Sequence, residues 1–288
     1  MRIRAMPSRS GSPTVALWQL ARELQRLRLS HKMNRSEVAK VLEVNSATVG
    51  RWESAERVPR EKELKQLARY YELTPEEMDA LVELRRQAGK RGWWQSYDLG
   101  QRYGTFIGLE ADASEIEIYE SSIITGLLQT EDYAREVIRG TLPRGDPTSV
   151  EQEVEVRLAR QRRFQSESDC HLWVIMGEAA LRQLVGDRKV MRDQLSHLLE
   201  LMEHPRITLQ VIPFTAGVHV GMPLPSFMIM RLADYGLTTV YVEGNSSNLF
   251  LETETDVARH DALFNQLRLA GVGADLARSL MSGIIREL

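Results

Sequence analysis

The residues best equipped to do chemistry lie in one short stretch, from Ser46 to Arg51. Ser46 and Thr48 carry hydroxyl groups that donate and accept hydrogen bonds, and Ala47 carries a methyl group that can contact the methyl of thymine. Arg51 has the planar guanidinium that holds the O6 and N7 atoms of guanine with two hydrogen bonds. Side chains of these types, this close together, are suited to reading the edges of DNA bases.

Two short helical patterns, joined by a tight connection, would position these side chains. Asn34 and Asn45 precede the two patterns, and an asparagine oxygen there can accept from the free backbone N–H groups of a helix start. Apolar residues at helical spacing would give the two helices one shared core: Val38, Ala39, Leu42, Val49 and Trp52. This is the helix-turn-helix arrangement, whose second helix can enter the major groove of DNA.

Four residues beside the base-reading set are predicted to contact phosphates: Asn34, Arg35, Arg57 and Arg60. Asn34 and Arg35 lie at a helix start, where free N–H groups and a guanidinium can meet one phosphate together. Arg57 and Arg60 belong to the polar loop that follows the second helix. Residues 1–13 contain Arg2, Arg4 and Arg9 but little to bury, so we expect a disordered arm there.

Three further helical patterns complete an all-α domain, which we place at residues 14–88. Thr14 to His31 form the first, with its leucines on one side and Arg22, Arg26 and Arg28 largely on the other. A fourth helix is expected from Glu61 to Tyr70. Thr74 caps a fifth, which has proline in its first turn and runs to about Ala88.

The stretches Leu24–Arg28, Asn34–Ala39 and Val44–Glu53 together resemble the Xre/Cro repressor-type DNA-binding domain, over about Leu17 to Leu73. Readers of this type gain affinity from twofold half-sites, so we expect a homodimer and a palindromic operator in double-stranded DNA. The family often has glycine where this chain has Glu43. Because glycine reaches a left-handed backbone at little cost and glutamate does not, we expect this turn to be built differently.

The charge distribution agrees with a phosphate-binding module at the N-terminus. Residues 1–90 hold 18 Lys and Arg against 12 Asp and Glu, a net charge of +6, while the remaining 19 and 28 give −9. Uneven surface charge alone could produce this split. No apolar run is long enough for a membrane span or a signal peptide, and Cys170 is the single cysteine, so we expect a cytoplasmic protein without a disulfide.

The remainder of the chain is predicted to hold a linker at residues 89–102 and an α+β domain at 103–288. Trp93 and Trp94 in the linker are expected to anchor it onto the second domain. Ile116 and Ile118 read as part of a helical region. Alternating apolar residues predict a small, mainly antiparallel sheet flanked by helices, with strands at 171–176, 207–213, 227–232, 238–243 and 249–252.

This second part resembles the C-terminal domain of actinobacterial regulators of the WhiJ type. Seven segments carry the likeness, and they are Trp93–Trp94, Leu109–Ala111, Tyr119–Glu120, Gly126–Ala134, Gln194–Leu195, Val211–Phe214 and Tyr241–Glu243. The resemblance implies a developmental or antibiotic-production regulator, commonly encoded beside a small partner protein in an antitoxin-like pairing.

Glu178, His219, Tyr241 and Glu243 form the candidate ligand or partner pocket of this domain. His219 lies in a loop of glycines and prolines, and the simpler interpretation is that it hydrogen-bonds its own loop. No second histidine or cysteine stands at metal-ligand spacing, and no phosphate loop or nucleophile elbow is present. We therefore expect no enzyme, no metal and no cofactor.

Two hypotheses follow. The first is a sequence-specific DNA-binding transcriptional regulator whose C-terminal domain senses a small-molecule effector or a small partner protein. The second is an antitoxin-like interaction module that binds a small neighbour-encoded protein and contacts DNA only for autoregulation. The acidic C-terminal part motivates the second hypothesis.

Overall fold

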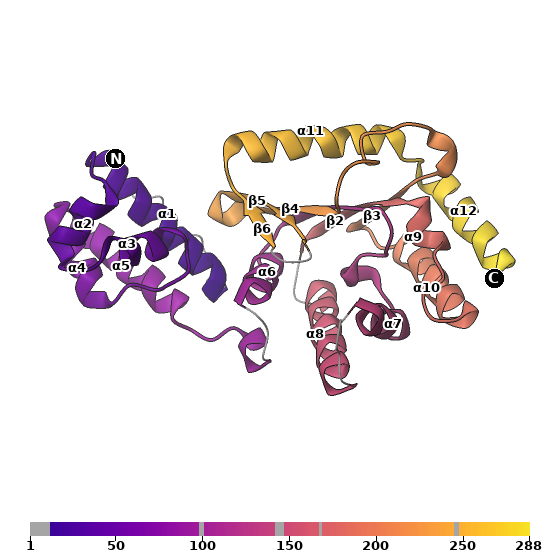
Figure 1. Ribbon diagram of the computed structural model, residues 1–288, viewed down its shortest axis with the longest axis horizontal. Coiled ribbons are helices and arrows are strands. Elements are labelled where there is room, and N and C mark those ends of the chain that lie inside the picture. The colour runs from indigo at the N-terminus through magenta and orange to yellow at the C-terminus, as the bar shows by residue number, and fades with distance from the viewer. Residues whose placement is uncertain (1–11, 98–100, 142–146, 167–168, 245–247) are drawn as a thin grey trace. The chain divides into compact units, whose positions relative to one another are not determined.

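The computed structural model describes residues 12–97, 101–141, 147–166, 169–244 and 248–288 (Figure 1). Most of the predicted arm, with its three arginines, lies outside the described residues, as do residues 98–100 of the predicted linker. The chain divides into two compact units, Met1–Asp112 and Ala113–Leu288. The domain limits drawn from the sequence stay predictions.

The first unit is helical and contains the five helices expected from the sequence. These are α1 (Pro13–Ser30), α2 (Arg35–Leu42), α3 (Ser46–Glu53), α4 (Glu61–Tyr70) and α5 (Pro75–Ala88). Asn34 accepts a hydrogen bond of 3.0 Å from the Glu37 N–H, and Asn45 accepts one of 2.8 Å from the Ala47 N–H. Both predicted asparagine caps are therefore present.

Four consecutive helices end in the same way. Lys32, Glu43, Ala55 and Glu72 adopt positive φ angles of 53°, 55°, 56° and 51°. The next residue then donates its N–H to a carbonyl five positions back, as Val44 does to Ala39 at 3.0 Å. The expectation of a different turn at Glu43 was wrong. Val44 packs against the core, which holds the glutamate in the left-handed conformation.

The first unit continues past α5 into a short 3-10 helix, η1 (Trp93–Ser96), and α6 (Gln101–Ala111). Trp94 is buried, and a Cβ atom added at Gly108 of α6 would lie 3.0 Å from its ring. The same Cβ atom would come within 2.3 Å of the Thr14 hydroxyl. Ser12, which caps α1, also donates its hydroxyl to the Gly108 carbonyl at 2.9 Å. Gly108 therefore lets α6 approach both α1 and Trp94 closely.

The second unit contains a six-stranded mixed sheet in the order β3-β2-β1-β4-β5-β6. The strands are β1 (Glu115–Glu120), β2 (His171–Gly177), β3 (Ile207–Ile212), β4 (Phe227–Leu232), β5 (Leu237–Val242) and β6 (Leu249–Leu251). The α+β class is confirmed, and the last five strands lie where the sequence predicts them. β1 pairs in parallel with β2, and β2 with β3, while the pairings on the other side of β1 are antiparallel.

The interpretation of Ile116 and Ile118 as helical was wrong, because both lie in the central strand β1. Glu117 between them is also buried, and its carboxylate accepts a hydrogen bond of 2.7 Å from Arg231 on β4. The same guanidinium also reaches Asp261 on α11 (Glu254–Ala270) at 2.7 Å. A buried acid is tolerated in this strand because a cation from the neighbouring strand compensates it.

Helices cover both faces of the sheet. Figure 1 shows α11 along one face, with α7 (Glu131–Thr141) and α8 (Pro147–Ser166) on the other. Tyr119, Phe227 and Phe264 belong to the core between the sheet and α11. Two more helices, α9 (Glu178–Arg182) and α10 (Arg188–Leu201), connect β2 to β3, and α12 (Ala274–Glu287) follows α11.

Buried glutamines hold the irregular segment that follows β1. The Gln194 side chain donates to the Leu128 carbonyl at 2.8 Å and accepts from the Thr130 N–H at 2.7 Å. The Gln161 amide donates to the Gly126 and Gln129 carbonyls at 2.7 and 2.8 Å. These contacts replace the backbone partners that a helix or strand would supply, so the segment can lie buried.

The left-handed helix end at Glu43 leads to the first prediction. Replacing Glu43 with glycine should raise the free energy of unfolding of the first unit by about 1 kcal/mol, since a side chain at positive φ is disfavoured by that amount. Urea unfolding followed by circular dichroism measures the change. The control variant Lys40→Gly, inside α2, should lose about 1 kcal/mol. Equal losses in both variants would contradict the prediction.

Candidate nucleic-acid interface

The four predicted base-reading residues lie on the side of α3 that faces away from the core. Val49 and Trp52 are both 2% exposed and pack against the other helices. Ser46, Ala47 and Arg51 are exposed, and Thr48 is half-buried. Within the described ranges, no hydrogen bond or ion pair engages the Arg51 guanidinium. These side chains are therefore available to a ligand, and the core does not need them.

A buried carboxylate fixes the last residue of α3 to two other helices. The Glu53 side chain is 1% exposed and accepts hydrogen bonds of 2.6 and 3.0 Å from Nε and Nη2 of Arg28 on α1. Nε of Arg35 on α2 donates to the second Glu53 oxygen at 2.8 Å. Arg28 also donates to the Met33 carbonyl at 2.9 Å. One carboxylate thus sets the position of α3 relative to α1 and α2.

The prediction that Arg28 lies on the outer side of its helix was wrong. The residue is 8% exposed because its guanidinium turns inward to Glu53, and that hydrogen bond raises the pKa of Arg28. Tyr71 lines the same small cavity as Arg28 and Glu53. Burial raises the pKa of Tyr71 to about 12, so its hydroxyl stays protonated beside the ion pair.

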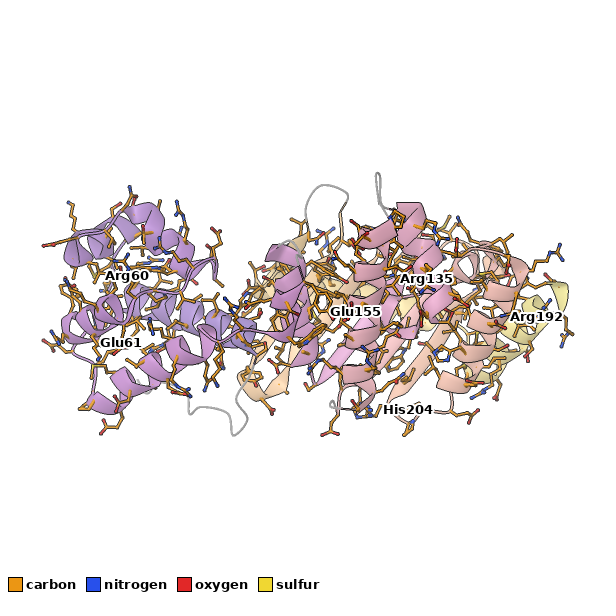
Figure 2. The ribbon with its side chains drawn as sticks, turned by 90° about the horizontal axis from the view of Figure 1, so that it is seen from below. Arg60, Glu61, Arg135, Glu155, Arg192 and His204 are labelled. Carbon is orange, nitrogen blue, oxygen red and sulfur yellow. The ribbon has the colours of Figure 1, made fainter. Side chains whose placement is uncertain are left out.

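The predicted phosphate contacts surround α3. Asn34 is exposed, and its side chain caps α2. Arg35 is 49% exposed although its Nε is bound to Glu53, and its Nη1 would lie 3.9 Å from a Cβ atom at Gly50. Arg57 and Arg60 are exposed in the loop after α3, and Figure 2 shows Arg60 beside Glu61, where α4 begins. The structure therefore brings Arg35 to α3 itself.

The four residues of the predicted pocket fall into two pairs. Glu178 accepts a hydrogen bond of 2.8 Å from the Phe214 N–H, and Nδ1 of His219 accepts one of 3.2 Å from the Gly221 N–H. Both side chains therefore bind the backbone of the connection between β3 and β4. For His219 this agrees with the simpler interpretation, that it hydrogen-bonds its own loop. Tyr241 lies buried on β5 with its ring 5.3 Å from that of Phe250, and Glu243 follows β5. A pocket formed by all four stays a prediction.

Glu120, the last residue of β1, was not among the predicted site residues. Its carboxylate accepts a hydrogen bond of 2.5 Å from the Ser226 hydroxyl, which precedes β4. Burial raises the pKa of Glu120 to about 7, and the nearby Glu243 contributes to the rise, while Ser226 and Arg157 oppose it. An acid with this pKa changes charge near neutral pH.

The residues that the structure describes lack two kinds of feature. They contain no group of three or more His, Cys, Asp or Glu side chains that could hold a metal ion. None of their helices is both long and apolar enough to cross a membrane.

Comparison with known families matches both parts of the chain. A helix-turn-helix domain matches residues 19–81, which contain α2 and α3, and a domain of unknown function (DUF5753) matches residues 103–282. No enzyme domain was identified, and no curated protein or solved structure matches the chain significantly. The helix-turn-helix prediction is confirmed, whereas the Xre/Cro and WhiJ types stay predictions.

The buried carboxylate generates the second prediction. Replacing Glu53 with glutamine removes the negative charge between two guanidiniums, so the free energy of unfolding should fall by about 2–3 kcal/mol. Thermal unfolding measures the loss. Glu56→Gln, at an exposed position three residues later, is the matched control and should change stability by less than about 0.5 kcal/mol. Similar small losses in both variants would show that the ion pair does not hold the unit together.

The raised pKa of Glu120 leads to the third prediction, on the pH dependence of stability. In the folded chain Glu120 keeps its proton up to pH about 7, whereas in the unfolded chain it loses it near 4.5. Its stabilising contribution is therefore complete below pH 4.5 and should be lost as pH rises to 7, by about 3 kcal/mol. Melting temperatures from pH 4.5 to 8 test this. Glu120→Gln should flatten the profile, whereas the control Asp234→Asn at an exposed turn should not.

Proposed function

The chain belongs to the family defined by the domain of unknown function DUF5753, and we propose that it is a sequence-specific DNA-binding transcriptional regulator. One observation carries the proposal. Ser46, Ala47 and Arg51 are exposed, and Thr48 is half-buried, on a helix whose position is set by the buried Glu53 carboxylate. A reader of bases needs free side chains on a fixed helix, because hydrogen bonds to base edges require a defined geometry.

The roles of the residues follow from their chemistry. Arg51 binds guanine, Ala47 and Thr48 contact thymine methyl groups, and Ser46 hydrogen-bonds a base edge. The phosphates are held by Arg35, Arg57, Arg60 and the α2 start at Asn34. Since phosphate contacts carry no sequence information, they set only the register of the protein on the duplex.

The regulator acts as a homodimer on a palindromic operator. Each helix-turn-helix reads one half-site, and two copies place their readers one or more turns of the duplex apart. The second unit receives the signal, from a small-molecule effector or from a small partner protein. Its net negative charge keeps it from competing for the phosphates that the first unit binds.

Selection of bound duplexes from a random pool tests the function directly. The full-length protein, at about 150 mM salt to suppress nonspecific phosphate binding, should enrich a palindrome with half-sites about 10 bp apart or a multiple of that. If no sequence is enriched over several rounds, although random DNA is retained at low salt, the protein is not a sequence reader.

Arg51 gives the fourth prediction. Arg51→Ala should cost about 1–3 kcal/mol of binding free energy on the selected duplex and relax the preference at one base position. Arg57→Ala is the control, because a lost phosphate contact weakens selected and random duplexes alike. Fluorescence anisotropy with both duplexes measures the two effects. An equal loss on both duplexes for Arg51→Ala would remove the base-reading role from this residue.

A further inference from the structure

The connection between β3 and β4, residues 213–226, exposes large apolar side chains, and we call it the β3–β4 loop. Phe214 is 65% exposed, Val218 93% and Met222 67%. No aspartate, glutamate, lysine or arginine occurs between Arg206 and Arg231, although 27% of the chain is charged. Exposed apolar residues grouped in this way are typical of a protein–protein contact.

The backbone of the β3–β4 loop is held in place, so these side chains are presented in a fixed arrangement. The buried Glu178 carboxylate binds the Phe214 N–H at 2.8 Å. At the other end, the Tyr119 hydroxyl donates to the Gly221 carbonyl at 3.0 Å. A Cβ atom at Gly221 would lie 2.4 Å from that hydroxyl, so the loop is pressed against the sheet there.

Anchoring residues alternate with the exposed ones. Val220 and Leu224 pack into the core between the sheet and α11, while Val218 and Met222 point outward. Gly217, next to Val218, has φ 73° and ψ −150°, a conformation that only glycine adopts readily. The exposure of Val218 is therefore a property of the folded loop, since its neighbours on both sides are fixed.

We propose that the β3–β4 loop is the twofold contact of a homodimer, with Val218 close to the axis. This inference rests on the proposed function, in which two copies of the helix-turn-helix domain bind the two half-sites of one operator. In a twofold interface a residue near the axis meets its own copy, so any charge there would face an identical charge. A loop without charged residues satisfies this requirement. A different protein could instead supply opposite charges, so it would not require a charge-free loop.

The contact extends beyond the β3–β4 loop itself. A stable interface needs about 800 Å² from each partner, which is more than three side chains provide. The end of α11 reaches the loop, because Leu267 lies 2.8 Å from a Cβ atom placed at Gly221. Leu269, two residues later, is 88% exposed, but it lies on the opposite side of the helix from the buried Leu267. We therefore include in the dimer surface only the turn of α11 that borders the loop.

Sedimentation velocity of the full-length protein at about 10 μM tests the interface without DNA. The wild type should sediment as a dimer, and Val218→Asp and Val218→Lys should each sediment as monomers because like charges meet at the axis. An equimolar mixture of the two variants should regain dimers. Leu249→Asp, on the edge strand β6, is half exposed and should remain a dimer.

A second measurement does not depend on weakening the interface. Val218→Cys should form a disulfide-linked dimer under mild oxidation, because two copies of one residue lie together only near a twofold axis. Cys170 is buried and supplies no background. The control Leu249→Cys should stay unlinked. Unchanged circular dichroism and melting temperature will show that each variant is folded.

Three results in sedimentation would overturn the proposal: a monomeric wild type, a dimer that survives Val218→Asp, or no dimer in the mixture of the Asp and Lys variants. A monomeric chain that attaches to lipid vesicles or to another protein through Val218 would overturn it as well. Binding of each variant to a duplex with a single half-site tests DNA reading separately from the dimer contact, because one half-site needs only one copy of the chain. Val218→Asp leaves α3 unchanged, so half-site binding within twofold of wild type would show that DNA reading stands even where the dimer contact fails.

Discussion

The arrangement of the first unit depends on one buried carboxylate. Glu53 ends α3, and the guanidiniums of Arg28 and Arg35 bind it from α1 and α2. Apolar packing alone would allow α3 to slide or rotate by a fraction of a turn, since hydrophobic contacts have little directional preference. The hydrogen bonds to Glu53 are directional, so they select one orientation of the base-reading face. Arg35 also lies beside Gly50, which brings a cation next to α3.

The second unit uses buried polar groups for a similar purpose. Gln161 and Gln194 satisfy the backbone of a segment whose only regular structure is the short 3-10 helix η2 (Gly126–Leu128). Arg231 compensates Glu117 inside the sheet, and Glu178 fixes the start of the β3–β4 loop. In each case a side chain far away in the sequence supplies the partner. The position of irregular segments is therefore determined by the folded sheet and its helices, and not by local preference.

Local signals sufficed to predict the helices of the first unit and five of the six strands, because caps and apolar spacing act within a few residues. Which side of α3 is buried and which is exposed could be predicted for the same reason, whereas the reading of bases stays a prediction. The pairing of Arg28 with Glu53 joins positions 25 residues apart, and no local pattern indicates which face of the helix an arginine takes. Strand β1 was missed because glutamate is unusual in a strand, and Arg231, which makes Glu117 acceptable there, is 114 residues away.

The left-handed helix ends carry a consequence for how this reader can evolve. Lys32, Glu43, Ala55 and Glu72 each hold a conformation that costs a side chain roughly 1–2 kcal/mol. None of the four belongs to the base-reading set on α3. A substitution on α3 that weakens its packing can thus be offset by a glycine at one of these four turns, all of which lie outside the helix. Substitution by glycine at these four positions would raise stability without changing the exposed side chains of α3. Stability and the side chains of α3 can therefore change independently in evolution.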